Sequence, residues 1–166
     1  DAPVIVVGGE ALIDLILHPD GRLAAVPGGG PYNTARTIGR LGVPVAFVGG
    51  LSTDRFGRRL HDGLVADGVD DKLATITDRP TTLAVAELDP VGVATYRFYL
   101  DGTSAAALEP AGLPSMPGRA VTAVHVGTLG LVLEPLATAM EALVAGAPDD
   151  AVVMIDQRKL PGQEVY

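Results

Sequence analysis

Three consecutive glycines, Gly28 to Gly30, are followed by Pro31 and, two residues later, by Asn33. Glycine has no Cβ, so such a segment can turn tightly, adopt positive φ and let a ligand approach its backbone N–H groups. Pro31 suits the first turn of a helix, where its missing N–H is no loss, and the Asn33 amide can both donate and accept hydrogen bonds. The segment therefore predicts a turn that binds a polyhydroxylated ligand.

Asp14 is a second candidate, because it places a carboxylate inside the apolar run 11–17. A buried charge is unfavourable unless hydrogen bonds satisfy it, and the hydroxyl groups of a ligand could supply them. The alternative is a strand whose Asp14 face is exposed to water, since alternate residues of a strand point to opposite faces. If Asp14 is buried, it is the best candidate in the sequence for a carboxylate that binds sugar hydroxyls.

Two common nucleotide-binding motifs do not occur in the sequence. A dinucleotide fingerprint would need a glycine two residues after Gly8, where Glu10 stands, and no Gly-Lys-Ser/Thr is present to form a P-loop. The histidines His18, His61 and His125 show no metal-ligand spacing, and we expect them in a turn, on a helix and in a strand. The residues themselves thus indicate neither a nucleotide phosphate cradle nor a metal site.

The chain has 166 residues, of which 48% are apolar, so it is long enough for one domain with a buried core. Its net charge of −8 and pI near 4.7 argue against nucleic acid and anionic membranes, which need clustered Lys and Arg. The absence of cysteine excludes disulfides and thiolate sites. No apolar run approaches the roughly 20 residues of a membrane span, and no signal pattern opens the sequence. We therefore expect a cytoplasmic protein with a small-molecule partner.

Strands and helices alternate in the part of the chain that must position these candidates. The runs 3–7 and 43–48 have strand character, while 31–41 has helical periodicity and ends before Gly42. A second helix is expected between a capping Asp54 and Gly68. This alternation predicts an α/β fold with a parallel sheet, continued by a strand over 121–126, a helix over 134–145 and a strand over 151–155.

The β-rich residues 82–99 interrupt this pattern as two runs around the turn sequence Asp89-Pro90-Val91-Gly92. They predict an inserted hairpin whose two faces differ, because Tyr96 and Arg97 point in opposite directions along a strand. We expect one α/β domain over residues 1–156, a hairpin lid at about 82–99 to which 11–27 also contribute, and an irregular tail over 157–166.

Five segments together resemble the N-terminal half of the ribokinase-type, or phosphofructokinase B type, carbohydrate kinases. These segments are Gly9–Asp14, Gly28–Ala35, Leu41–Gly42, Val48–Gly50 and Asp54–Gly57. Their order and spacing match the family, and the opening Gly-Glu-Ala-Leu-Ile-Asp is most similar to the fructokinase and 2-keto-3-deoxygluconate kinase branch. The resemblance implies a ribokinase-like three-layer α/β/α fold with a mostly parallel central sheet and a small inserted β lid.

The resemblance also implies an activity, namely transfer of the ATP γ-phosphate to a primary hydroxyl of a sugar or sugar acid. Asp14, Gly28, Gly29 and Asn33 would then bind sugar hydroxyls, and the lid would present Tyr96 and Arg97 to the substrate. ATP and Mg²⁺ are implied for the intact protein. The family's catalytic Gly-Ala-Gly-Asp motif does not occur in these residues, so we expect the catalytic and nucleotide-binding residues, and the C-terminal half of the fold, to lie outside them.

The oligomeric state, the alternative functions and the identity of the sugar are the remaining points. An inserted hairpin has free strand edges, so a homodimer through the lid is expected. The alternatives to a sugar kinase are a non-catalytic sugar-binding or regulatory module and a nucleoside kinase of the same superfamily. Asp and Asn side chains do not distinguish one sugar from another, so the sequence leaves the sugar undetermined.

Overall fold

The computed structural model describes residues 2–116 and 120–157. Of the expected tail over 157–166, only Gln157 lies within the described residues. The strands are β1 (Val4–Gly8), β2 (Leu12–Leu17), β3 (Leu23–Gly28), β4 (Val45–Val48), β5 (Gly50–Ser52), β6 (Thr75–Thr77), β7 (Leu83–Leu88), β8 (Ala94–Tyr99), β9 (Val121–Gly127) and β10 (Val152–Asp156). The α-helices are α1 (Gly30–Arg40), α2 (Arg55–Ala66) and α3 (Leu136–Ala145).

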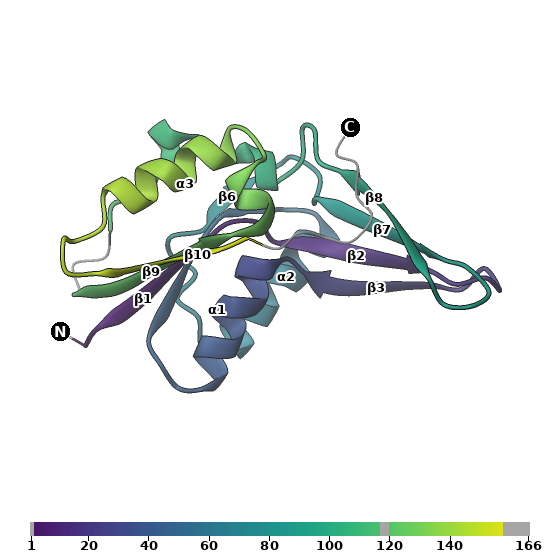
Figure 1. The fold of residues 1–166 in the computed structure, drawn as a ribbon, viewed down its shortest axis with the longest axis horizontal. Coiled ribbons are helices and arrows are strands. Elements are labelled where there is room, and N and C mark those ends of the chain that lie inside the picture. The colour runs from purple at the N-terminus through teal and green to yellow at the C-terminus, as the bar shows by residue number, and fades with distance from the viewer. Residues whose placement is uncertain (1, 117–119, 158–166) are drawn as a thin grey trace.

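The main sheet has the order β10-β9-β1-β4, and all of its strand pairs are parallel. Helix α3 covers one face, where Leu136 and Met140 pack against Val6 and its neighbours. Helices α1 and α2 cover the other face (Figure 1), where Tyr32 and Leu64 join the same apolar cluster as residues of β1 and β4. These three layers confirm the expected α/β/α architecture.

The helix boundaries follow from local sequence. Pro31 lies in the first turn of α1, which it favours because that turn leaves N–H groups unpaired anyway. The Asp54 side chain caps α2 by accepting a hydrogen bond from the Gly57 N–H at 2.7 Å, so the predicted cap is confirmed. Gly68 follows α2 with φ of +78°, a conformation that glycine adopts without strain.

A second sheet, which we call the outer sheet, has the order β3-β2-β7-β8 and extends away from the main sheet (Figure 1). It consists of two antiparallel hairpins, β2–β3 and β7–β8, joined by parallel pairing of β2 with β7. The β2–β3 hairpin closes through a loop in which the His18 N–H donates to the Arg22 carbonyl at 2.9 Å. Residues 82–99 and 11–27 thus contribute to one sheet.

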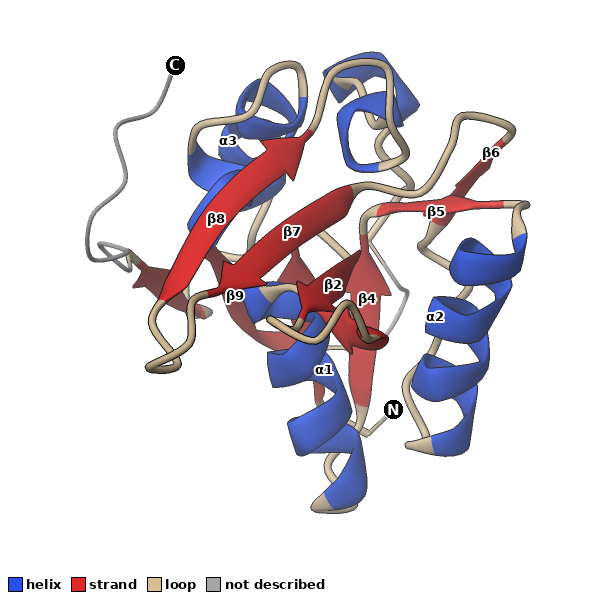
Figure 2. Ribbon diagram, turned by 90° about the vertical axis from the view of Figure 1, so that its right-hand side faces the viewer, coloured by secondary structure: helices blue, strands red, loops and turns tan. Residues whose placement is uncertain are grey.

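One face of the outer sheet lies against the body of the protein, and Figure 2 shows how the sheet stands beyond the ends of α1 and α2. Ile13 belongs to the apolar cluster shared with those helices, and Leu15, Ala25 and Leu83 pack against it. Because side chains alternate along a strand, the residues between them face the other way. That opposite face carries Asp14.

Strands β1 and β10 of the main sheet differ sharply in burial. The β1 side chains are largely buried, whereas β10 lies at an edge with the side chains of Val152 to Ile155 between 42% and 61% exposed. Helices in residues 2–116 and 120–157 include none long and apolar enough to cross a membrane.

Candidate functional site

The glycine turn connects β3 to α1 in a conformation that only glycine tolerates well. Gly29 has φ of +106°, and a Cβ there would stand 2.6 Å from the Glu10 carbonyl oxygen. A Cβ on Gly28 would collide with the Asp14 carboxylate, which therefore lies directly over the Gly28 backbone. The structure thus brings together two candidates, Asp14 and Gly28, that are 14 residues apart in sequence.

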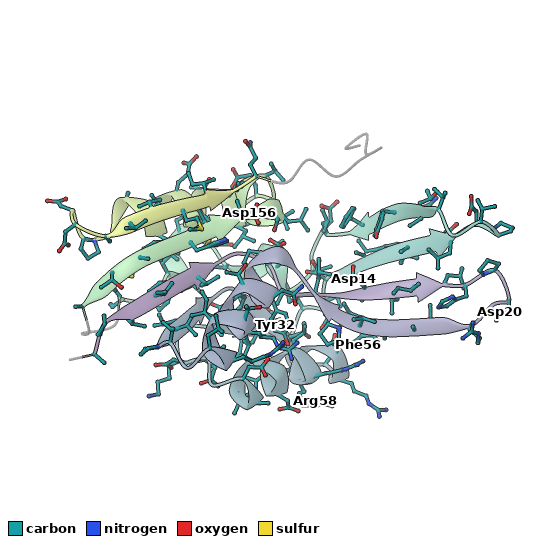
Figure 3. All side chains as sticks on the ribbon, turned by 60° about the horizontal axis from the view of Figure 1, so that its bottom comes forward. Asp14, Asp20, Tyr32, Phe56, Arg58 and Asp156 are labelled. Carbon is teal, nitrogen blue, oxygen red and sulfur yellow. The ribbon has the colours of Figure 1, made fainter. Side chains whose placement is uncertain are left out.

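Asp14 itself is half-buried on β2, at the end of the outer sheet nearer the main sheet (Figure 3). Within residues 2–116 and 120–157, no group donates a hydrogen bond to its carboxylate. Burial raises the pKa of the Asp14 carboxyl, because the charged form loses water without gaining a partner. A ligand with hydroxyl donors would supply the hydrogen bonds that the protein does not.

Strand register identifies the other residues on this face. Asp14 lies opposite Ala84 of β7, and Ala84 lies opposite Phe98 of β8. One row along, Ala86 lies opposite Tyr96, whose ring stacks on that of Phe98 with centroids 6.3 Å apart. Two small alanines therefore separate the Asp14 carboxylate from a pair of stacked aromatic rings, and these residues form one polar and aromatic surface.

Arg97 is placed on the opposite face from Tyr96. It lies opposite Val85, which lies opposite Leu15, and Leu15 packs against the buried cluster beneath the sheet. The structure therefore groups Tyr96, but not Arg97, with Asp14. Phe98 was missed as a site residue, although its spacing of two from Tyr96 along a strand was a signal for a shared face.

Asn33 lies in the first turn of α1 and is exposed. Its backbone N–H donates to the Gly29 carbonyl at 2.9 Å, which ties the residue to the glycine turn. In the described ranges its side-chain amide has no hydrogen-bond partner. The amide is therefore available to a ligand bound at the turn.

Glu10 is a residue of this region that the sequence analysis did not select. Its side chain is only 2% exposed and accepts hydrogen bonds from the Gly30 N–H at 3.2 Å, the Gly130 N–H at 3.1 Å and the Thr128 hydroxyl. Burial raises the pKa of Glu10, although these hydrogen bonds oppose the shift. The sequence did contain a signal for Glu10, because it is a charged residue between the two apolar runs that form β1 and β2.

The Glu10 carboxylate also affects which ligand charges the glycine turn favours. Its carboxylate accepts from Gly30 at the start of α1, where a helix would otherwise attract a phosphate. A phosphate placed there would meet a second negative charge. The turn is therefore better suited to the hydroxyl groups of a ligand than to the phosphates of a nucleotide.

Metal-ligating side chains of the described residues are spread through the fold and do not gather in one place. In the part of the chain that the structure describes, no group of three or more His, Asp or Glu side chains could hold a metal. His18 lies in a turn, His61 in α2 and His125 in β9, as expected from the sequence. The described residues thus offer no such cluster of ligands for Mg²⁺.

Comparison with known proteins identifies the family of the chain. Residues 3–159 match the model of the pfkB family of carbohydrate kinases. A fructokinase of Rhizobium leguminosarum bv. trifolii is 36% identical over 163 residues, which are 96% of this chain and 49% of that protein. The chain therefore spans about half the length of the curated relatives it matches.

Solved structures give the same result for the fold. The crystal structure of a fructokinase from Xylella fastidiosa superposes with a TM-score of 0.82 at 26% identity, covering 97% of this chain and 56% of that one. The same enzyme with bound ATP superposes with a TM-score of 0.82 at 25% identity and covers 97% and 55%. The three layers and the outer sheet thus define a ribokinase-like fold.

The match to the family model covers most of the chain. The protein belongs to the pfkB family of carbohydrate kinases.

Proposed function

We propose that the intact protein transfers the γ-phosphate of ATP to a primary hydroxyl of a sugar or sugar acid, and that the residues described here bind the sugar. The observation that carries the proposal is the half-buried Asp14 carboxylate, which lies over Gly28 without a hydrogen-bond donor from the described chain. Family membership supports the reaction, and the fructokinase relatives make fructose the first sugar to test.

Each site residue has a defined role in this proposal. Asp14 accepts hydrogen bonds from sugar hydroxyls, and Gly28 and Gly29 leave room for the sugar beside the backbone. Asn33 donates to one hydroxyl and accepts from another. Tyr96 and Phe98 offer apolar ring surface to the C–H groups of the sugar.

The outer sheet acts in this proposal as a lid over the sugar. A lid excludes water, which otherwise competes with the sugar hydroxyl for the phosphoryl group. ATP with Mg²⁺ supplies the phosphoryl group and the charge that stabilises its transfer. The ATP-bound Xylella fructokinase supports the use of ATP, and we place ATP and Mg²⁺ outside the described residues.

An assay of the full-length protein tests this function. We expect ATP-dependent phosphorylation of at least one member of a panel of ketoses, aldoses, keto-deoxy acids and nucleosides. Phosphorylation of nucleosides alone would favour the nucleoside kinase alternative. Calorimetric binding of a sugar with no phosphorylation would favour a non-catalytic sugar-binding module, and absence of both binding and turnover would reject the proposal.

We further propose that two copies associate through their outer sheets in the cytoplasm, the compartment that supplies ATP. The two edge strands support this interface, because Val26 of β3 and Tyr99 of β8 are both exposed. Light scattering of the full-length protein should give twice the monomer mass. The double substitution Val26→Lys and Tyr99→Lys should return the mass to that of a monomer, and a wild-type monomer at high concentration would contradict the interface.

A further inference from the structure

The carboxylate of Asp54 serves two parts of the fold at once. One oxygen, Oδ1, accepts from the Gly57 N–H at 2.7 Å at the start of α2, and also from the Thr81 hydroxyl at 2.6 Å. The other oxygen accepts from the Thr81 backbone N–H at 2.8 Å. A helix cap needs only the first of these contacts, so the contacts with Thr81 require a separate explanation.

Thr81 lies at the base of the outer sheet, where β7 begins and the chain after β8 returns. The neighbouring Thr82 hydroxyl hydrogen-bonds the Thr103 hydroxyl at 2.7 Å and accepts from the Ala105 N–H at 3.0 Å. The Ser104 N–H donates to the Pro80 carbonyl at 2.8 Å. Both ends of the β7–β8 hairpin therefore meet in one buried polar cluster, and Asp54 connects this cluster to α2.

A second contact joins α2 to the opposite edge of the outer sheet. The Arg59 side chain donates from Nη1 to the Ala25 carbonyl of β3 at 2.9 Å. The start of α2 therefore contacts the sheet at β3 and at the base of β7, and β2, the one strand between them, carries Asp14. These two contacts attach the sheet to α2 on both sides of β2.

The strength of the Asp54 contact is consistent with its charge. Burial acts against the charged carboxylate, but the hydrogen bonds from Thr81 and Gly57 outweigh it and lower the pKa of Asp54. Hydrogen bonds to an ionised acceptor are about twice as strong as neutral ones. The contact therefore joins α2 to the β7–β8 hairpin through hydrogen bonds to an ionised acceptor.

We infer that Asp54 is a positioning residue, which through Thr81 holds the outer sheet in the orientation that presents Asp14, Tyr96 and Phe98 to the sugar. This role rests on the proposed function. If only a fraction of molecules have the correct sheet orientation, the apparent affinity for sugar falls by that fraction. At saturating sugar the bound state is restored, so loss of the contact should raise KM and leave kcat unchanged.

The test compares two threonines that make the same kind of contact in different places. Thr138 of α3 donates its N–H and its hydroxyl to the Glu134 carboxylate, as Thr81 does to Asp54, but on the far side of the main sheet. In the full-length protein, Thr81→Val should raise the sugar KM about three- to tenfold with kcat within twofold, because it removes one hydrogen bond to a charged group. Thr81→Ser, which keeps the hydroxyl, should restore the wild-type KM, and Thr138→Val should leave KM unchanged.

Hydrogen exchange supplies a readout that does not depend on turnover. The amides of residues 83–88 should exchange about tenfold faster in Thr81→Val than in Thr138→Val, since the sheet opens more often. Asp54→Ser should show the same change while the exchange of α2 stays protected, because serine also caps helices.

Two results would overturn the inference. One is equal exchange of residues 83–88 in the Thr81→Val and Thr138→Val variants, and the other is a fall in kcat at unchanged KM in Thr81→Val. If the wild-type protein phosphorylates no sugar, the proposed function fails, and the exchange comparison alone then decides whether Asp54 holds the sheet.

Discussion

The main sheet and the outer sheet of this protein are held in different ways. The main sheet has α3 on one face and α1 and α2 on the other, and its central strands are almost wholly buried in apolar clusters. Within the described residues, the outer sheet packs on the body only near its base, through residues such as Ile13 and Leu15, whereas Tyr96 and Tyr99 on its edge strand β8 are exposed. Side-chain contacts also attach it to α2, through Asp54 and Arg59.

Because of this difference, we expect the main sheet to determine folding stability and the outer sheet to determine ligand affinity. Close-packed apolar contacts are strong and resist small movements, whereas a few hydrogen bonds can be broken and remade singly. Asp14, Gly28 and Asn33 lie where the two parts meet. Substitutions in the main sheet should therefore alter folding, and substitutions in the outer sheet should alter ligand affinity.

The largest effect is expected from the core that α2 shares with the main sheet. Leu64 is fully buried there, and Leu64→Ala should lower the free energy of unfolding by about 2–5 kcal/mol, because it leaves a cavity. The adjacent Val65 is 52% exposed, and Val65→Ala should change the free energy by less than about 0.5 kcal/mol. Urea denaturation of the full-length protein measures both, and equal effects would contradict the role of the buried core in stability.

A smaller effect, on binding alone, is expected at Asp14. Asp14→Asn should weaken sugar binding about tenfold to a hundredfold, the range for loss of hydrogen bonds to a charged group. Folding stability should not fall, because the wild-type carboxylate is half-buried without a donor in the described chain. Calorimetry and thermal unfolding measure the two quantities, and a destabilised variant would show that Asp14 has a structural role instead.

The smallest expected effect is the dependence of folding stability on pH. The contributions of Asp14 and Asp54 to this dependence should have opposite signs. The folded-state pKa of Asp14 is raised above 3.8, so its ionisation opposes folding and this penalty disappears as the pH falls toward that value. The folded-state pKa of Asp54 is lowered, so its contribution is present above 3.8 and is lost as the pH falls through the folded pKa.

Denaturation curves between pH 7 and pH 3 check this contrast. As the pH falls, the stability of the wild-type protein should rise relative to Asp14→Asn and fall relative to Asp54→Asn. Parallel curves for the two variants would mean that the two carboxylates do not differ in their surroundings.

Much of the fold could be predicted because its signals are local. Apolar periodicity located α1, α2 and the strands of the main sheet, and the Asp54 cap is visible in four residues of sequence. Strand β3 was not predicted, since its small residues and Pro27 have weak strand preference and the pairing with β2 stabilises it.

The candidate site was predictable only where its residues share a motif. Gly28, Gly29 and Asn33 lie in one turn, but the donors to Glu10 lie 20 to 120 residues away from it. The separation of Arg97 from Asp14 depends on the register of three strands. No local pattern contains that information, because it arises when distant strands pair.

Strand β2 pairs with β3 on one side and with β7 on the other, and the two pairings join segments at very different distances along the chain. The β2–β3 hairpin closes over a short loop, whereas the partner residues of β7 lie some 70 residues along the chain, so we expect the hairpin to form before β7 pairs with β2. A slip of one residue would exchange Asp14 for an apolar neighbour and turn the carboxylate into the core. The loop between Leu17 and Leu23 therefore selects which side chain of β2 lies over Gly28, although it is at the far end of the hairpin from Asp14.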